Sequence, residues 1–202
     1  MKKYKLVAIG NSITNGFPFR RSQSFPSILR ELTGYEVINK GNNGETTEQV
    51  FLRFEKDVIN HKPDFVTILT TTNDFIYDTA SPSEAFLYLQ KMIEISIENN
   101  IRVIFLSPLL TVPYMAQEAW KTENITDYEK VNRELLEFSN LTIKYIEELN
   151  DERAKYLHLQ KAFKIFEEET GQEQVYRDGL HPSILGQEFI ARYIYDNFPF
   201  NV

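Results

Sequence analysis

The chain has 202 residues, of which 42% are hydrophobic and 25% are charged, an ordinary composition for a globular protein with a substantial core. A formal net charge of −7 without a long Lys/Arg run argues against nucleic-acid binding, because phosphate contacts need clustered positive charge. The lack of cysteine excludes a disulfide scaffold, a thiolate metal site and a cysteine nucleophile.

Strand and helix patterns alternate through the first half of the chain. In chain order, the expected elements are a strand at 4–9, a helix at 24–34, a short strand at 36–39, a helix from 46 or 47 to about 60, and a strand at 64–69. Ser24 and Gly34 are typical of the start and the end of a helix. Apolar Val50, Phe54 and Val58 recur with the helical period.

The second half continues the alternation. We expect a helix from Ser83 to about Asn99, a strand at 102–106, a helix at 126–149, a short strand at 155–159, and helices at 161–169 and 183–197. Residues 111–124, between the strand at 102–106 and the helix at 126–149, form the longest irregular stretch. Long structureless segments of compact domains are often functional lids.

This order predicts the fold class. The middle strands lack polar alternation, which is typical of a parallel sheet covered by helices on both faces. We therefore expect residues 1–202 to form a single domain, a flavodoxin-like three-layer α/β/α sandwich with about five parallel strands. Sites in such folds form beyond the carboxyl ends of the strands.

The chain carries no signal for export or membrane insertion. The apolar run after the N-terminal lysines is only strand-length, unlike a secretory signal. No stretch approaches the ~18 apolar residues of a membrane span. A cytoplasmic location is expected, and the oligomeric state stays open.

Polar segments follow several of the expected strands and could converge on one site. Ser12 follows the first strand, Gly44 the second and Asn73 the third, and the C-terminal region carries Asp178-Gly179-Leu180-His181. Serine needs a base, and the base needs an orienting group. We interpret Ser12 as the nucleophile, His181 as its base and Asp178 as the orienting group. The N–H groups of Ser12 and Gly44 and the Asn73 amide would donate to an oxyanion.

Each of these features taken alone has an ordinary structural explanation. A serine after a strand is usually a turn or cap, Gly44 follows Asn43 as in many turns, and Asn73 could cap a helix. Only their order, together with their places at strand ends, favours the hydrolase interpretation. A metal site is weakly supported, because only Asp178 and His181 lie close together in sequence.

Four ordered blocks resemble a known family, the GDSL-type esterases and lipases, also called SGNH hydrolases. The blocks are Gly10-Asn11-Ser12, Gly44, Asn73-Asp74 and Asp178-x-x-His181. The resemblance implies strand order 2-1-3-4-5 and cleavage of carboxylic esters of small molecules through an acyl-enzyme, without a cofactor. Two positions depart from the family pattern: Asn11 replaces an aspartate, and Thr71 replaces a glycine, which suggests a different local backbone or a narrower pocket.

Substrate contacts and substrate identity are less defined. Aromatic candidates for the pocket wall are Phe75, Tyr114 and Trp120, together with Phe17, Phe19 and Tyr77. Lipid-type esters, aryl esters, thioesters and acetylated carbohydrates all remain open, as does acyl transfer to an alcohol. The departures at Asn11 and Thr71 favour an alternative, a non-catalytic or degenerate module that binds acylated lipid or carbohydrate.

Overall fold

A central parallel sheet organises the molecule. The computed structural model describes residues 3–120 and 126–200. Its strands are β1 (Lys5–Gly10), β2 (Glu36–Gly41), β3 (Phe65–Leu69), β4 (Arg102–Leu106) and β5 (Ala154–Leu157). They pair in parallel in the order β2-β1-β3-β4-β5. The predicted fold class and strand order are confirmed.

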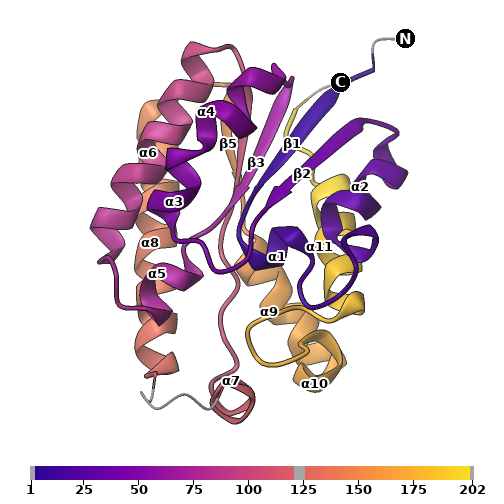
Figure 1. Ribbon diagram of the computed structural model, residues 1–202, viewed down its shortest axis with the longest axis vertical. Helices are drawn as coiled ribbons and strands as arrows, with labels where there is room; N and C mark the ends of the chain where they lie inside the picture. The colour runs from indigo at the N-terminus through magenta and orange to yellow at the C-terminus, as the bar shows by residue number, and fades with distance from the viewer. Residues whose placement is uncertain (1–2, 121–125, 201–202) are drawn as a thin grey trace.

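Helices cover both faces of this sheet (Figure 1). The longer helices are α2 (Phe25–Thr33), α6 (Pro82–Glu98), α8 (Tyr128–Leu149), α9 (Leu159–Thr170) and α11 (Ile184–Asp196). The shorter ones are α1 (Ser12–Asn15), α3 (Thr47–Leu52), α4 (Phe54–Asp57), α5 (Thr72–Ile76), α7 (Pro113–Ala119) and α10 (Gln172–Val175), with 3-10 turns η1 (Arg21–Gln23) and η2 (Ile59–His61). In Figure 1, α3, α6 and α8 lie on one side of the sheet, and α2 and α11 on the other.

Alternate residues of each strand supply two separate cores. Val7, Val66 and Val103 pack with α6 and α8 on one face. Leu6 and Ile104 pack with α2, α9 and α11 on the other face. Because both faces are covered, the strands are apolar without alternation, as a parallel sheet requires.

Helices differ from the sequence expectation by two residues at the starts of α8 and α9, by the additional short helices α1, α5 and α10, and in the three places that follow. The N-cap of α6 is Ser81 rather than Ser83, because the Ser81 side chain accepts from the Glu84 N–H and forms a capping box. The helix expected from 46 to 60 ends at Leu52, and α4 and η2 follow it. The stretch expected to be irregular contains α7, while residues 121–124 lie outside the described part of the chain.

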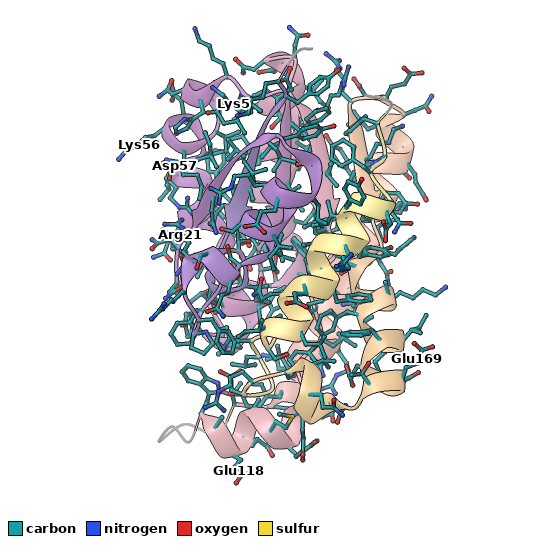
Figure 2. All side chains as sticks on the ribbon, turned by 90° about the vertical axis from the view of Figure 1, so that its right-hand side faces the viewer. Lys5, Arg21, Lys56, Asp57, Glu118 and Glu169 are labelled. Carbon is teal, nitrogen blue, oxygen red and sulfur yellow. The ribbon has the colours of Figure 1, made fainter. Side chains whose placement is uncertain are left out.

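The carboxyl edge of the sheet is where the chain leaves β1, β3 and β4 for α1, α5 and α7. Figure 1 shows α1 near the middle of the molecule below β1, α5 lower and α7 at the lower end, with the two termini at the upper end. Figure 2 shows the same polarity, with Lys5 of β1 at the upper end and Glu118 of α7 at the lower end. Among the described residues, no helix has the length and apolar character to cross a membrane.

Candidate active site

Ser12, His181 and Asp178 form one hydrogen-bonded chain at the carboxyl edge. His181 Nε2 lies 3.0 Å from Ser12 Oγ, and His181 Nδ1 lies 2.8 Å from Asp178 Oδ2. Ser12 and His181 are only 8% and 7% exposed. A hydroxyl, an imidazole and a carboxylate within hydrogen-bond reach of each other are the arrangement that activates a serine nucleophile.

The serine begins a short helix that the sequence did not reveal. β1 ends at Gly10, and Ser12 is the first residue of α1. The first N–H groups of a helix have no intrahelical partner and are free to face a ligand. A fully buried Gln187 of α11 fixes this turn, because its side chain donates to the Ile13 carbonyl over 3.1 Å and accepts from the Phe25 N–H over 2.8 Å.

The loop that carries Asp178 and His181 is fixed by backbone hydrogen bonds. The Arg177 N–H donates to the His181 carbonyl over 2.8 Å, beside an isolated antiparallel bridge between Tyr176 and Pro182. Ser183 has an extended backbone, and its side chain caps α11 by accepting from the Gly186 N–H.

The Asp178 carboxylate is held in its ionised form. Its Oδ1 accepts from the backbone N–H groups of Leu180 and His181, at 3.0 and 2.8 Å. Burial by itself would raise the pKa of Asp178, but the hydrogen bonds and charge of His181 outweigh burial and hold that pKa below its usual value. An ionised Asp178 keeps the proton on Nδ1, which leaves Nε2 free to accept from Ser12.

Gly44 and Asn73 lie on the same pocket as Ser12. Gly44 has φ 77°, a left-handed conformation that glycine adopts without strain. The Asn73 side-chain amide donates to the Glu45 carbonyl over 2.9 Å. An amide nitrogen carries two hydrogens, so the second one remains available for a ligand.

The two departures from the family pattern lie beside these groups. Thr71 precedes α5 with φ 99° and ψ −35°, so the backbone keeps a glycine-like conformation despite its β-branched side chain. A β-branched residue in this conformation is strained. Asn11 occupies the N-cap position of α1, although its side chain makes no capping hydrogen bond.

A pocket of about 190 Å³ opens over the serine. Its lining includes Ser12, His181, Gly44 and Asn73, with apolar walls from Phe17, Ile76, Tyr77, Trp120, Tyr128 and Leu180. The rings of Phe17 and Trp120 contact the His181 ring, with centroids 4.8 and 5.7 Å away. Aromatic contacts of this kind shield the imidazole from water.

The aromatic candidates from the sequence separate into two groups. Trp120, with Phe17 and Tyr77, lines the pocket. Phe75 does not, because it is 2% exposed and packs against Phe138 in the core. Neither Phe19 nor Tyr114 lines this pocket either, and Tyr114 is 54% exposed.

Tyr128 and Leu180 are pocket residues that sequence reasoning missed. Tyr128 is the first residue of α8, and Leu180 is one of the unspecified positions of the Asp-x-x-His block. Only the position of Leu180 between Asp178 and His181 offered a signal for it.

Asp74, next to Asn73, is a buried carboxylate with an unusual environment. It is 1% exposed, and both of its oxygens accept from Thr47. Burial raises its pKa to about 6, and the nearby charge of Glu48 adds to the rise. Within residues 3–120 and 126–200, no group of three or more His, Asp or Glu side chains could hold a metal ion.

Comparison with known proteins assigns the family. Residues 8–189 match the GDSL-like Lipase/Acylhydrolase family, and the chain belongs to it. An acetylxylan esterase from Geobacillus stearothermophilus is 27% identical over 163 residues, which cover 79% of this chain and 70% of that protein. A crystal structure of a catalytic mutant of a G. stearothermophilus acetylxylan esterase has a TM-score of 0.77 at 22% identity, covering 98% of this chain and 95% of that one.

A third relative matches only in part. An uncharacterized lipoprotein, YqeF, from Bacillus subtilis is 36% identical over 76 residues, which cover 34% of this chain and 31% of the lipoprotein. Membership of the family supports an ester hydrolase activity for the chain.

Proposed function

We propose that the chain is a serine esterase that works through an acyl-enzyme, with Ser12 as nucleophile, His181 as general base and Asp178 as orienting carboxylate. The continuous hydrogen-bonded path from Ser12 Oγ through His181 to Asp178, at 3.0 and 2.8 Å, carries the proposal. Two solved forms of the G. stearothermophilus esterase are catalytic mutants, one with a serine and one with an aspartate replaced by alanine.

Acylation begins with attack of Ser12 Oγ on the carbonyl carbon of the ester. His181 Nε2 takes the hydroxyl proton, and Asp178 stabilises the imidazolium that forms. Collapse of the tetrahedral intermediate breaks the bond to the alcohol oxygen, and the imidazolium returns its proton to that oxygen. Water then attacks the acyl-serine with His181 again as base, which releases the carboxylic acid and restores the Ser12 hydroxyl.

The negative charge of each tetrahedral intermediate needs donors. The backbone N–H groups of Ser12 and Gly44 and the second hydrogen of Asn73 Nδ2 serve this purpose in the proposal. Their support is that all three residues line the pocket in which the Ser12 hydroxyl lies. Losing one such donor typically costs about 3 kcal/mol of transition-state stabilisation.

The pocket favours a short acyl group. Its volume of about 190 Å³ is small, since ligand sites for drug-sized molecules span roughly 300–1,000 Å³. Phe17, Trp120 and Tyr128 close the space around the serine. Acetyl esters therefore fit the proposal best, and an acetylated carbohydrate, the substrate class of the relative from G. stearothermophilus, is the first natural substrate to test.

A panel of p-nitrophenyl esters of increasing acyl length tests the proposal. We expect the highest kcat/KM for acetate, with a steep fall for long chains. Ser12→Ala should lower kcat by about 10⁴-fold or more and abolish fluorophosphonate labelling. Ser83→Ala, at an exposed serine of α6, is the matched control and should behave as wild type.

Two results would overturn the proposal. One is esterase activity in Ser12→Ala within a few-fold of wild type. The other is a wild-type protein that is silent across the panel and resists labelling, which would favour the non-catalytic binding module instead.

A further inference from the structure

The segment that carries Gly44 is attached to the rest of the site at several points. The Glu45 carbonyl accepts from the Asn73 amide over 2.9 Å, and the Glu45 carboxylate accepts from Arg53 Nε over 2.7 Å. Arg53 also donates to the Gly10 carbonyl over 2.9 Å, two residues before the serine. The relative positions of Ser12, Gly44 and Asn73 therefore depend on how this segment is held.

Asp74 makes the most unusual of these attachments. Its Oδ2 accepts from the Thr47 N–H over 2.9 Å and from the Thr47 hydroxyl over 3.0 Å, and its Oδ1 lies 3.1 Å from the same N–H. Thr47 is fully buried and lies three residues after Gly44. The consecutive residues Asn73 and Asp74 thus bind the segment 44–47 at two points.

Helix capping alone does not account for Asp74. α3 already has a local capping box, in which Thr46 and Gln49 each accept from the other's backbone N–H. In the part of the chain that the structure describes, the hydrogen-bond partners of the Asp74 carboxylate are neutral donors, from Thr47 and from the backbone of Asp74 itself, and no ion pair with a cation neutralises it. An unpaired buried carboxylate is costly and persists where it has a further role.

We propose that Asp74 is a positioning residue for the oxyanion site: its carboxylate anchors Thr47 and thereby keeps the Gly44 N–H and the Asn73 amide directed at one point above Ser12. This inference rests on the proposed function. A neutral side chain at this position offers one acceptor oxygen in place of two. The segment 44–47 then loosens, and the oxyanion donors lose their fixed geometry.

Protonation of Asp74 perturbs the same anchor. Asp74 also lines a second cavity of about 400 Å³ between α3 and α6, where the charged lining groups are Glu48, Glu84 and Lys91. The cavity gives the carboxylate a route for exchange of its proton with solvent. Burial raises the Asp74 pKa to about 6, so the anchor weakens on the acid side of neutrality.

The test compares Asp74→Asn with Glu48→Gln, which removes a neighbouring carboxylate from α3 and leaves the Thr47 contacts intact. For Asp74→Asn we expect kcat on p-nitrophenyl acetate to fall by about tenfold to a hundredfold, KM to change by less than about threefold, and fluorophosphonate labelling to slow in proportion. Below neutral pH the wild-type rate should fall with a steeper slope than that of Asp74→Asn. Glu48→Gln should match wild type in kcat, KM and labelling; because it removes a charge that raises the Asp74 pKa, its acid-side fall in rate should move to lower pH.

Hydrogen exchange separates this inference from the proposed function. Backbone amides of residues 44–47 should exchange about tenfold faster in Asp74→Asn, whether or not the protein cleaves an ester. If the wild type has no esterase activity, the proposed function fails, and the exchange result alone decides the role of Asp74 as anchor. Unchanged hydrogen exchange at residues 44–47 in Asp74→Asn would overturn the role of Asp74 as anchor.

A structural role that merely supports the fold gives a different result. Loss of activity only in step with loss of folded protein, or a kcat equal to wild type, would overturn the inference. If Asp74→Asn does not fold, Thr47→Val replaces it, because this change removes the hydroxyl donor to Asp74, together with the longer contacts of that hydroxyl to Thr70 and Thr71, at similar volume and keeps the backbone N–H donor. We then expect a threefold to tenfold lower kcat; a wild-type kcat would overturn the inference.

Discussion

Thr71 carries strain that a single substitution should release. Its φ of 99° lies where side chains with a Cβ are rarely found, and a β-branched residue is least suited to it. Thr71 is fully buried, and its hydroxyl accepts from that of Thr47 over 3.3 Å. We therefore compare Thr71→Gly with Thr71→Ala, since both lose this hydroxyl and only glycine removes the strain.

The expected difference follows from three terms. Backbone strain at such a conformation costs about 3 kcal/mol at the upper end of its range. Relative to alanine, glycine lowers the stability by roughly 1 kcal/mol because of its greater freedom in the unfolded chain. The lost burial of one methyl group lowers it by about 0.8 kcal/mol more. Thr71→Gly should therefore be more stable than Thr71→Ala by about 1 kcal/mol, opposite to the usual order.

Equilibrium unfolding in urea at constant pH measures the difference. Thr142 provides the control, because it is equally buried within the regular helix α8. There the alanine variant should be the more stable one, by about 1 kcal/mol. If Thr71→Ala equals or exceeds Thr71→Gly in stability, the strain assigned to Thr71 is absent.

Three further predictions concern stability and the pocket. Burial raises the pKa of Asp74 from its usual 3.8 to about 6, so the native state binds this proton more tightly, and the contribution of Asp74 to stability falls as pH rises from about 4 to 6. Asp74→Asn should thus gain about 2.4 kcal/mol relative to wild type between pH 4 and 7 in urea unfolding; a constant difference would refute this. Gly179→Ala should cost about 3 kcal/mol, because an added Cβ would lie 2.5 Å from the Ala116 nitrogen at φ 80°, and an unchanged urea midpoint would contradict that packing. Trp120→Ala should enlarge the space beside His181 and raise the butyrate-to-acetate ratio of kcat/KM by about tenfold; a ratio equal to wild type would remove Trp120 from the acyl-binding wall.

Local sequence signals predicted the sheet well and the helix boundaries less well. Residues 103–106 form an uninterrupted apolar run after Arg102, and β4 spans Arg102–Leu106 because both of its faces are buried. The apolar period of Val50 and Phe54 runs on past Leu52, yet the helix ends there. Arg53 turns inward to the carbonyls of Gly10 and Lys40, contacts between segments far apart in sequence. No local sequence pattern indicates these contacts of Arg53.

The pocket residues also divide into those that local sequence signals predicted and those whose placement depends on tertiary packing. Ser12, Gly44, Asn73 and His181 could be selected because each follows a strand or belongs to a spaced block. Phe75 was chosen on the same grounds, but the direction of its side chain depends on how α5 packs against α8. Side-chain orientation around a short helix depends on tertiary packing, so the position of an aromatic residue beside Asn73-Asp74 does not by itself predict a pocket wall.

The hydrogen bond between Ser12 and His181 spans 169 residues of sequence. In the proposed mechanism, the nucleophile is therefore synthesised long before its base and has no base until the C-terminal loop has docked. A chain in which this loop has not docked should not hydrolyse esters.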